Sequence, residues 1–362
     1  MLSTLSGPIG ATLAGGTKGT QAWVAFINGA GGLNGHPVEL TMADDGADPA
    51  RNRSQAQYLV EQKKDVAILM TQAPVSGQGS VSYFQEKRIP VIGSEGGSPW
   101  MTRNSMFFPQ LSSDPILGFT TAHAMGDVLV PQGKKKVALL YCVEIQGCSN
   151  LANPRGFQEA GFDIVYRASV SLAQPDFTAQ CLGARNAGAE SVAMFFDTQS
   201  VPRVADNCAS VGYKPVFGMP GQIAVDGHLK NPNLDGAVIG FPTASWFDTK
   251  IPAIAEFKSA MAKFAPGVVV DGSAVTGWAA GKLLERAGRN LGAPTSQALL
   301  DGLWSIQDDD LGGITAPLTF HKDAKNNGED MKLCYWIVQI KSGKWNGGDE
   351  RRCKPWDTKM LG

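Results

Sequence analysis

Short apolar runs recur along the chain and alternate with longer segments in which apolar residues have helical spacing. Runs typical of buried strands cover residues 66–70, 89–93, 137–141, 164–166, 192–196, 215–218 and 237–241. Helical segments cover residues 50–63, 76–87, 115–130, 175–187, 199–211, 251–264 and 273–290. Strands that alternate with helices form parallel sheets covered on both faces. The pattern therefore predicts an α/β fold whose last helices, within 251–304, are followed by a closing hairpin.

Polar loops follow the predicted strands. They cover residues 71–79, 93–100, 142–148, 197–200 and 219–222. Ser, Thr, Gln and Gly are frequent in them, and Glu95, Glu144 and Asp197 are their acids. Ligands of open α/β sheets bind beyond the carboxyl ends of the strands. Exposed backbone donors and small hydroxyls suit a polar or anionic small molecule, so we expect the ligand at these loops.

The glycine-rich stretch NGAGGLNGHPVELTMADDGADP at 28–49 invites comparison with a dinucleotide-binding loop. Such a GxGxxG loop follows a strand and opens a helix. Here the helical spacing of Trp23, Phe26 and Ile27 comes first and a strand-like alternation comes afterwards. Asn34 also stands where the third glycine is required. We therefore interpret the glycines as the end of a helix and a turn.

Other catalytic patterns are incomplete. GATLAGGT at 10–17 has Gly16 where a P-loop requires lysine, and GSEGG at 93–97 has Ile92 where a nucleophile elbow requires glycine. We expect Ser94 to be a hydrogen-bonding hydroxyl. No HExxH occurs, and ADDGAD at 43–48 lacks the closing Glu of an EF-hand, so Asp48-Pro49 is interpreted as a helix start. The sequence predicts no enzyme, no metal and no cofactor, although the separation of paired glycosidase carboxylates stays open.

Composition indicates an ordinary globular protein. The chain has 362 residues, a net charge of −1 and 43% hydrophobic residues, which is enough for two domains. Basic residues cluster only at Lys134–Lys136, so no nucleic-acid footprint is present. No apolar run reaches the roughly 20 residues that span a bilayer. No signal peptide opens the sequence, and we expect that any export signal has been removed.

The six cysteines form three local pairs along the sequence. None belongs to a CxxC motif, and zinc-ligand spacing is absent. Local pairs of this kind predict disulfides in an oxidising compartment. The alternative is six reduced thiols in a cytosolic protein. The predicted pairs are Cys142–Cys148, Cys181–Cys208 and Cys334–Cys353.

Several ordered blocks together resemble the leucine-type periplasmic binding proteins, the type I solute receptors of branched-chain amino-acid ABC importers. The likeness extends over nearly the whole chain. The blocks are SGP at 6–8 with KG at 18–19, FINGAGGLNGHPVEL at 26–40, ADDGADP at 43–49, Ser76-Gly77, IPVIG at 89–93 with SP at 98–99, ITAPLTF at 314–320 and KSGKW at 341–345.

The resemblance implies the type I periplasmic-binding-protein fold, with two doubly wound lobes joined by three hinge crossovers. We expect these crossovers near 112–116, 242–248 and 317–321. Lobe one then holds 1–114 plus 245–318, and lobe two holds 115–244 plus 319–362. The implied function is capture of a small carboxylate or amino-acid ligand, in the periplasm or at the cell surface, by a monomer that delivers it to an ABC importer permease.

The resemblance also implies a ligand grip. In the family a serine and the backbone after two strands of lobe one hold a ligand carboxylate, and these positions correspond to Ser76 and to Ser94, Glu95, Gly96 and Gly97. Gln72, in the loop after 66–70, is a further candidate. Thr12 stands where the family often has an aromatic residue in its first loop.

Lobe two departs from the family at Pro220, where amino-acid binders carry an acid for the ligand ammonium. Either Glu95, Glu144 or Asp197 supplies this charge, or the ligand has no ammonium. We favour a carboxylate on a hydrophobic or aromatic body.

Aromatic side chains could enclose that body. Core or hinge packing is the alternative for each of them. We favour Trp278 as the main wall, with Tyr141 next. The candidates are Trp100, Tyr141, Trp246, Phe247 and Trp278.

Three functions compete at this stage. The leading one is a non-catalytic solute receptor that serves a permease, and the second is a ligand sensor of the same fold that signals to another protein. No fused sensor or kinase segment is present, which weighs against the sensor. The third is an enzyme, and the absence of a nucleophile–base or metal pattern weighs against it.

Overall fold

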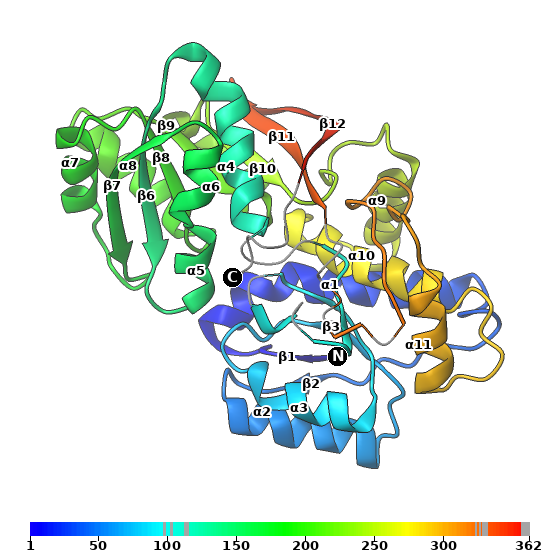
Figure 1. Cartoon of the computed structure of the whole chain (residues 1–362). Coiled ribbons are helices and arrows are strands. Elements are labelled where there is room, and N and C mark those ends of the chain that lie inside the picture. Colours follow the sequence, from blue (N-terminus) through cyan, green and yellow to red (C-terminus); the bar gives the residue numbers. More distant parts are fainter. Residues whose placement is uncertain are drawn as a thin grey trace. The chain divides into compact units, whose positions relative to one another are not determined.

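The structure is a computed structural model that describes residues 1–96, 99–101, 104–111, 116–322, 324–325, 327 and 332–355. The chain divides into two compact units (Figure 1). Unit 1 comprises Met1–Ser113, Trp246–Lys332 and Lys354–Gly362, and unit 2 comprises Asp114–Ser245 and Leu333–Cys353. Unit 1 therefore includes 319–332 and Lys354–Gly362, which the expected division assigned to lobe two. The segment 112–115, where the first crossover was expected, lies outside the described residues.

Unit 1 contains short parallel strands. Strand β1 (Leu2–Ser3) pairs with β2 (Ala43–Asp44), and β3 (Ile68–Thr71), β4 (Val91–Ser94) and β5 (Phe107–Phe108) form a second sheet in that order. A parallel bridge between Ser3 and Gln72 brings β1 beside the end of β3. The carboxyl ends of these strands therefore lie at the same edge of unit 1.

The helices of unit 1 follow the predicted pattern, with additions. They are α1 (Gly7–Gly29), α2 (Pro49–Gln57) continued by the π-helical turn η1 (Tyr58–Gln62), α3 (Gln78–Lys87), the 3₁₀ turn η2 (Pro99–Met101), α9 (Pro252–Phe264), α10 (Gly272–Ala287) and α11 (Ser296–Trp304). The predicted helix start at Asp48-Pro49 is confirmed, because the Asp48 carboxylate accepts a hydrogen bond of 2.6 Å from the backbone N–H of Arg51.

Helix α1 begins well before the helical spacing of Trp23, Phe26 and Ile27 and includes the GATLAGGT segment. Its glycines allow α10 to approach closely. A Cβ placed on Gly277 of α10 would lie 1.9 Å from the carbonyl oxygen of Gly16, and one on Gly19 would lie 2.0 Å from that of Ala274. The P-loop-like pattern is thus a helix–helix packing surface, where small residues set the interaxial distance.

The glycine-rich turn after α1 is confirmed, but the strand predicted after it is mostly wrong. Helix α1 ends at Gly29, and Gly31, Gly32 and Gly35 have φ values of 102°, 85° and 87°. The following segment forms a strand only at Ala43–Asp44. Instead of pairing with a strand, the backbone of Val38 exchanges hydrogen bonds with the side-chain amide of Asn28 at 2.8 and 2.9 Å.

Unit 2 is built on one larger sheet with the strand order β12-β11-β10-β9-β8-β6-β7. Its strands are β6 (Lys136–Cys142), β7 (Asp163–Val170), β8 (Ser191–Phe195), β9 (Val216–Pro220), β10 (Val238–Phe241), β11 (Leu333–Lys341) and β12 (Lys344–Lys354). Strands β6 to β10 are parallel, whereas β11 runs antiparallel to β10 and opens the predicted closing hairpin.

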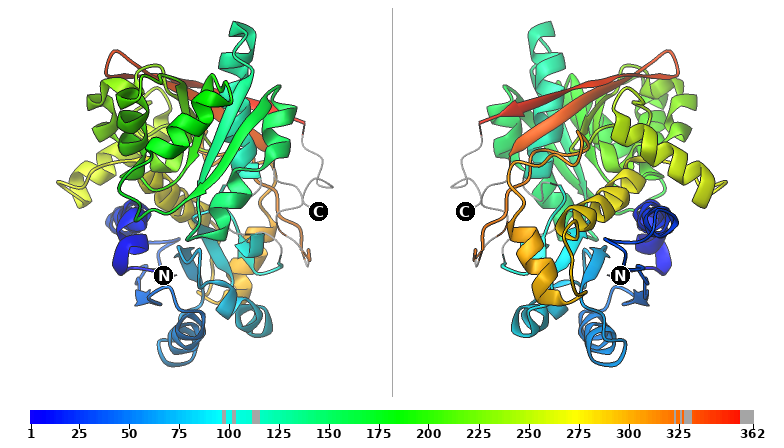
Figure 2. Two further views of the ribbon diagram at one scale, coloured as in Figure 1. Left: turned by 90° about the vertical axis from the view of Figure 1, so that its left-hand side faces the viewer. Right: turned by 90° about the vertical axis from the view of Figure 1, so that its right-hand side faces the viewer.

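Helices lie against both faces of this sheet (Figure 2). They are α4 (Ile116–Leu129), α5 (Gln146–Leu151), α6 (Pro154–Glu159), α7 (Thr178–Asn186) and α8 (Ser200–Ser210), with 3₁₀ turns η3 (Val130–Gln132), η4 (Gly221–Ile223), η5 (Asp226–Lys230) and η6 (Pro232–Leu234). Short helices α5 and α6 were not predicted. Phe157 of α6 and Met125 of α4 belong to the buried hydrophobic cluster that contains Leu139 and Phe195 of the sheet.

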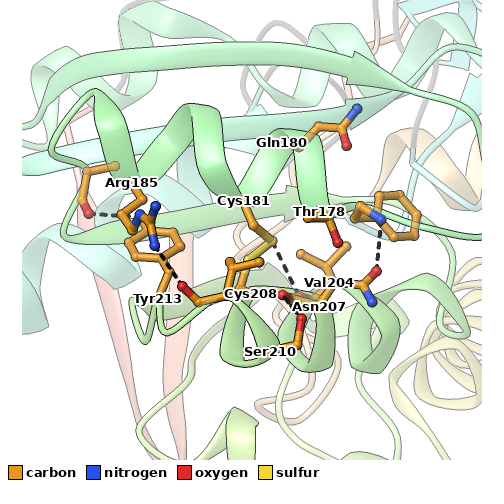
Figure 3. Close-up of a disulfide and its surroundings, with 12 residues drawn as sticks. Thr178, Gln180, Cys181, Arg185, Val204, Asn207, Cys208, Ser210 and Tyr213 are labelled. Atoms are coloured by element: carbon orange, nitrogen blue, oxygen red, sulfur yellow. Dashed lines mark hydrogen bonds between the residues drawn. A yellow bond between two sulfur atoms is a disulfide. The ribbon is translucent and has the colours of Figure 1, made fainter.

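All three predicted disulfides are confirmed. Cys142–Cys148 ties the end of β6 to α5, and Cys334–Cys353 joins β11 to β12. Cys181–Cys208 joins α7 to α8, where Figure 3 also shows hydrogen bonds between the two helices and their flanking residues. The linked helices are thereby fixed on one face of the unit 2 sheet.

Candidate functional site

A buried carboxylate organises the strand ends of unit 1. Asp45 follows β2, has no exposed surface and accepts four hydrogen bonds. The donors are Thr4 Oγ1 at 2.7 Å, Asn52 Nδ2 at 2.7 Å, Ser76 Oγ at 2.8 Å and the Ala47 N–H at 2.9 Å. Side chains after β1, β2 and β3 and on α2 thus meet at one acid.

This arrangement changes the role expected for Ser76. A serine hydroxyl has one proton to donate, and Ser76 donates it to Asp45. Ser76 is also fully buried. In this geometry the Ser76 proton is directed to Asp45 and not to a ligand carboxylate, which favours a structural role for this residue.

Gln72 is likewise engaged within the protein. Its Nε2 donates to the carbonyl oxygen of Leu13 at 3.0 Å, and its Oε1 accepts from Thr17 Oγ1 at 3.1 Å. The side chain is buried, and both ends of its amide hold α1 at the end of β3. We conclude that Gln72 positions α1, which differs from the predicted ligand contact.

Two consecutive residues at the end of β4 keep unpartnered polar atoms. The Ser94 hydroxyl is buried and has no hydrogen-bond partner, although its backbone is held by Gln110 on both sides at 2.9 Å. Both carboxyl oxygens of Glu95 are also buried without a partner. Gly96 follows with φ of 84°, a conformation that favours glycine. Both Ser94 and Glu95 are among the predicted site residues, and their contact with a ligand stays a prediction.

The environment of Glu95 favours its neutral form. The pKa of this carboxyl is raised to about 8, chiefly by burial and also by the charge of Asp45, against the lowering effect of the N–H groups of Glu95 and Ala73. Neither N–H has the geometry of a hydrogen bond to the carboxyl. A carboxyl that titrates near neutral pH can hold a proton or pair with a cation.

Thr12 and Gly97 are the other two predicted positions of unit 1. Thr12 lies inside α1, so it does not belong to a loop as expected, and its side chain is outside what the structure describes. Gly97 lies outside the described residues.

The two candidate acids of unit 2, Glu144 and Asp197, accept hydrogen bonds from residues of unit 2 itself. Glu144 is exposed and accepts hydrogen bonds from Ser171 Oγ at 2.7 Å and from the N–H of Leu172 at 2.8 Å. Asp197 accepts from the N–H and the hydroxyl of Ser200 at 2.9 and 2.6 Å, at the start of α8. Both carboxylates therefore have donors that do not depend on a ligand.

Pro220 is the last residue of β9, which extends two residues beyond the predicted strand 215–218. The nearby residue Gln222 is more informative. Gln222 lies in η4, and both its Oε1 and its Nε2 are buried without a partner. Sequence reasoning assigned it no role, although its place at the end of the predicted loop 219–222 could have drawn attention. Unit 2 thus has a neutral amide near the end of β9, where an acid was expected from the family.

Two of the five aromatic candidates, Trp278 and Trp246, are buried. Trp278 has no exposed surface and packs between Phe26 and Phe257, with ring centroids 5.3 and 5.7 Å away. This position matches core packing, the alternative considered for each aromatic candidate, and the role of Trp278 as a ligand wall stays a prediction. Trp246 is 4% exposed and packs edge-on against Phe247 at 5.2 Å.

The two remaining aromatic candidates also have protein partners. The Trp100 ring packs edge-on against the Phe107 ring, with the ring centroids 5.5 Å apart. Tyr141 packs against the buried cluster of unit 2 and carries the guanidinium of Arg167 at 4.7 Å from its ring centroid. Both Trp100 and Tyr141 are only partly buried and keep some exposed surface.

The described residues contain no group of three or more His, Cys, Asp or Glu side chains that could hold a metal ion. In the same part of the chain, none of the helices has the length and apolar character that a bilayer crossing requires.

Comparison with known proteins identifies the family to which this architecture belongs. The sequence profile of a family described as periplasmic binding protein matches residues 1–346. The chain belongs to this family. The predicted fold class, the type I periplasmic-binding-protein fold, is confirmed, and a solute-binding rather than a catalytic family is the one that matches.

Curated relatives of the periplasmic binding protein are distant. An amino acid binding protein of Pseudomonas aeruginosa is 27% identical over 179 residues, 48% of this chain and 47% of the relative. The Leu/Ile/Val-binding protein homolog 3 of Brucella melitensis is 28% identical over 201 residues, 53% of this chain and 52% of the relative. The chain thus spans about half the length of the curated relatives it matches.

Solved structures share the fold over nearly the whole chain. A branched-chain amino acid ABC transporter protein of Thermus thermophilus with bound valine has a TM-score of 0.80 and 16% identity, and covers 97% of this chain and 95% of its own. A solute-binding protein of R. palustris in complex with benzoate has a TM-score of 0.74 and 18% identity, with 95% and 93% covered. At this identity the likeness shows the fold alone.

Proposed function

We propose that this protein is an extracytoplasmic solute-binding protein of an ABC importer that captures a small carboxylate and delivers it, as a monomer, to a permease. The observation that carries the proposal is the pair of unpartnered polar groups, Ser94 Oγ and the Glu95 carboxyl, at the carboxyl end of β4. Polar groups that are buried without partners are costly unless something completes them, and a ligand does so here.

Two ligand classes fit this proposal. A carboxylate on an apolar body is favoured by the neutral Pro220 and Gln222, where an acid for an ammonium is missing. Its aromatic enclosure is weaker than expected, because Trp278 lies in a core. An amino acid is favoured by Glu95. Glu144 and Asp197 accept hydrogen bonds within the protein, whereas the Glu95 carboxyl accepts none.

The test is a panel of amino acids and amine-free carboxylates in thermal-shift assays, followed by calorimetry on the compounds that stabilise the protein. A ligand that binds only the folded protein raises its stability by RT ln(1 + [L]/Kd). We expect saturable stabilisation by at least one carboxylate and full recovery of that compound, unchanged, by mass spectrometry. Chemical conversion of a stabilising compound, or stabilisation by none of them, would contradict the proposal.

A further inference from the structure

Glu95 differs from Asp45, the other buried acid at these strand ends. Its carboxyl oxygens are buried and receive no hydrogen bond, whereas Asp45 receives four. A buried ionised carboxyl without partners is strongly disfavoured, so the free protein keeps this group protonated near neutral pH. A protonated carboxyl still has acceptor capacity that nothing in unit 1 uses.

The electrostatic surroundings of Glu95 select the charge of what binds there. The charge that acts on it is the carboxylate of Asp45, which follows β2 and is fixed by its four donors. The N–H groups of Glu95 and Ala73 lower the pKa of this carboxyl, but none of the described residues donates a hydrogen bond to its oxygens. A second negative charge near these oxygens is repelled, and a positive charge is attracted.

We propose that the Glu95 carboxyl accepts the protonated amino group of the ligand, so that this residue of unit 1 makes the protein select solutes that carry an amine. The inference rests on the proposed solute-binding function and deepens it by naming the ligand class. It also explains how an amine can be recognised although Pro220 occupies the place of the acid expected in unit 2.

Binding is then coupled to a proton. The neutral carboxyl loses its proton to solvent, and the resulting carboxylate pairs with the ligand ammonium, so one positive charge enters and one proton leaves. With a pKa of about 8, roughly nine in ten molecules are protonated at pH 7, and binding releases close to one proton. Affinity for an amine therefore rises by up to about tenfold per pH unit below pH 8 and levels off above it.

The experiment compares Glu95→Gln with Glu86→Gln, a control at an exposed position of α3. Probes are matched pairs, L-leucine with 4-methylpentanoate and L-phenylalanine with 3-phenylpropanoate, extended to the other amino acids and to simple amines. Calorimetry at pH 7 in phosphate and in Tris, which differ in ionisation enthalpy, counts the protons released. Thermal melts without ligand show that each variant folds.

We expect an amine probe to bind the wild type and Glu86→Gln with release of about one proton. Glu95→Gln should bind it at least roughly 30-fold more weakly and without proton release. The substitution leaves the buried ligand ammonium without its charged partner, and removing one partner of a buried charge pair typically costs about 2–5 kcal/mol of binding free energy.

The two proposals fail separately. If amine-free acids bind and amines do not, or if Glu95→Gln leaves amine affinity and proton release unchanged, the role of Glu95 is wrong and the solute-binding function stands. If no compound of the panel binds, both are wrong.

Discussion

Ser76→Ala separates a structural role of this hydroxyl from a ligand-binding role. Ser76 Oγ donates to Asp45 Oδ2 at 2.8 Å, and neither residue has exposed surface. The substitution removes one of the four donors of a buried carboxylate and leaves the other three in place. Water cannot replace the lost donor without entering the packed strand ends. We therefore expect a loss of stability with little change in ligand affinity.

The magnitude follows from the type of bond. Hydrogen bonds to charged groups contribute about 1.5–3 kcal/mol, and the three remaining donors place Ser76 toward the lower value. A change of about 1.5–2 kcal/mol lowers the Tm of a domain of this size by roughly 3–8 °C. Urea unfolding should show a lower midpoint with an unchanged slope.

Ser80→Ala is the matched control for this measurement. Ser80 is also a buried serine, but its hydroxyl donates to the neutral carbonyl of Gly77 at 3.3 Å. Its loss should cost clearly less, about 0.5–1 kcal/mol. The reasoning is refuted if Ser76→Ala leaves the urea midpoint unchanged and weakens ligand binding tenfold or more, because the hydroxyl would then face the ligand.

Three further outcomes are expected. The pKa of Glu95 in the folded protein, about 8, lies above its usual value of 4.5. The free energy of unfolding should therefore fall by roughly 1.4 kcal/mol per pH unit as pH rises from about 4.5 to 8. Glu95→Gln should flatten this decline, measured by urea unfolding at several pH values. Gly277→Ala should destabilise by at least about 1–3 kcal/mol, because its Cβ would lie 1.9 Å from the carbonyl of Gly16. Replacing Cys181 and Cys208 by Ala should cost about 2–4 kcal/mol, measured against the oxidised wild type.

Each of these outcomes has its own check. Gly292→Ala adds a Cβ with no heavy atom within 4 Å and should be nearly neutral. A Glu95→Gln titration that keeps the full wild-type slope would contradict the buried, unpartnered carboxyl. Free thiols at Cys181 or Cys208 in non-reducing peptide maps would contradict the disulfide itself.

Periodicity located the main elements well because buried strands and amphipathic helices leave local patterns. Each predicted apolar run coincides with a strand, from β3 to β10, and the Asp48-Pro49 start is where α2 begins. The strands at 2–3, 43–44 and 107–108 span two residues each, which is too short to show a period. Helix α1 was predicted only in part because its glycines, which suit the contact with α10, dilute the apolar pattern.

Side-chain roles were predicted less well because they depend on interactions between distant positions. Asp45 meets Thr4, 41 residues away, and Ser76, 31 residues away, and no local pattern contains these distances. Trp278 could have been recognised as a core residue from its helix. Almost every residue of α10 is buried, including small residues such as Gly277 and large ones such as Leu283. A helix that is buried all round offers no exposed face to a ligand.

Asp45 and Glu95 are two buried carboxyl groups of unit 1 with different roles: the first stabilises the fold, and the second is proposed to bind the ligand. Unit 1 directs four donors to Asp45 and none to Glu95, so the strand ends are held by one acid while the other stays costly to ionise. Folding alone would favour a neutral side chain at position 95, because a glutamine titrates no proton and repels no anion. A buried acid that is kept without partners fits a group whose partner comes from outside the chain, and a ligand ammonium has the charge and the donors that this position lacks.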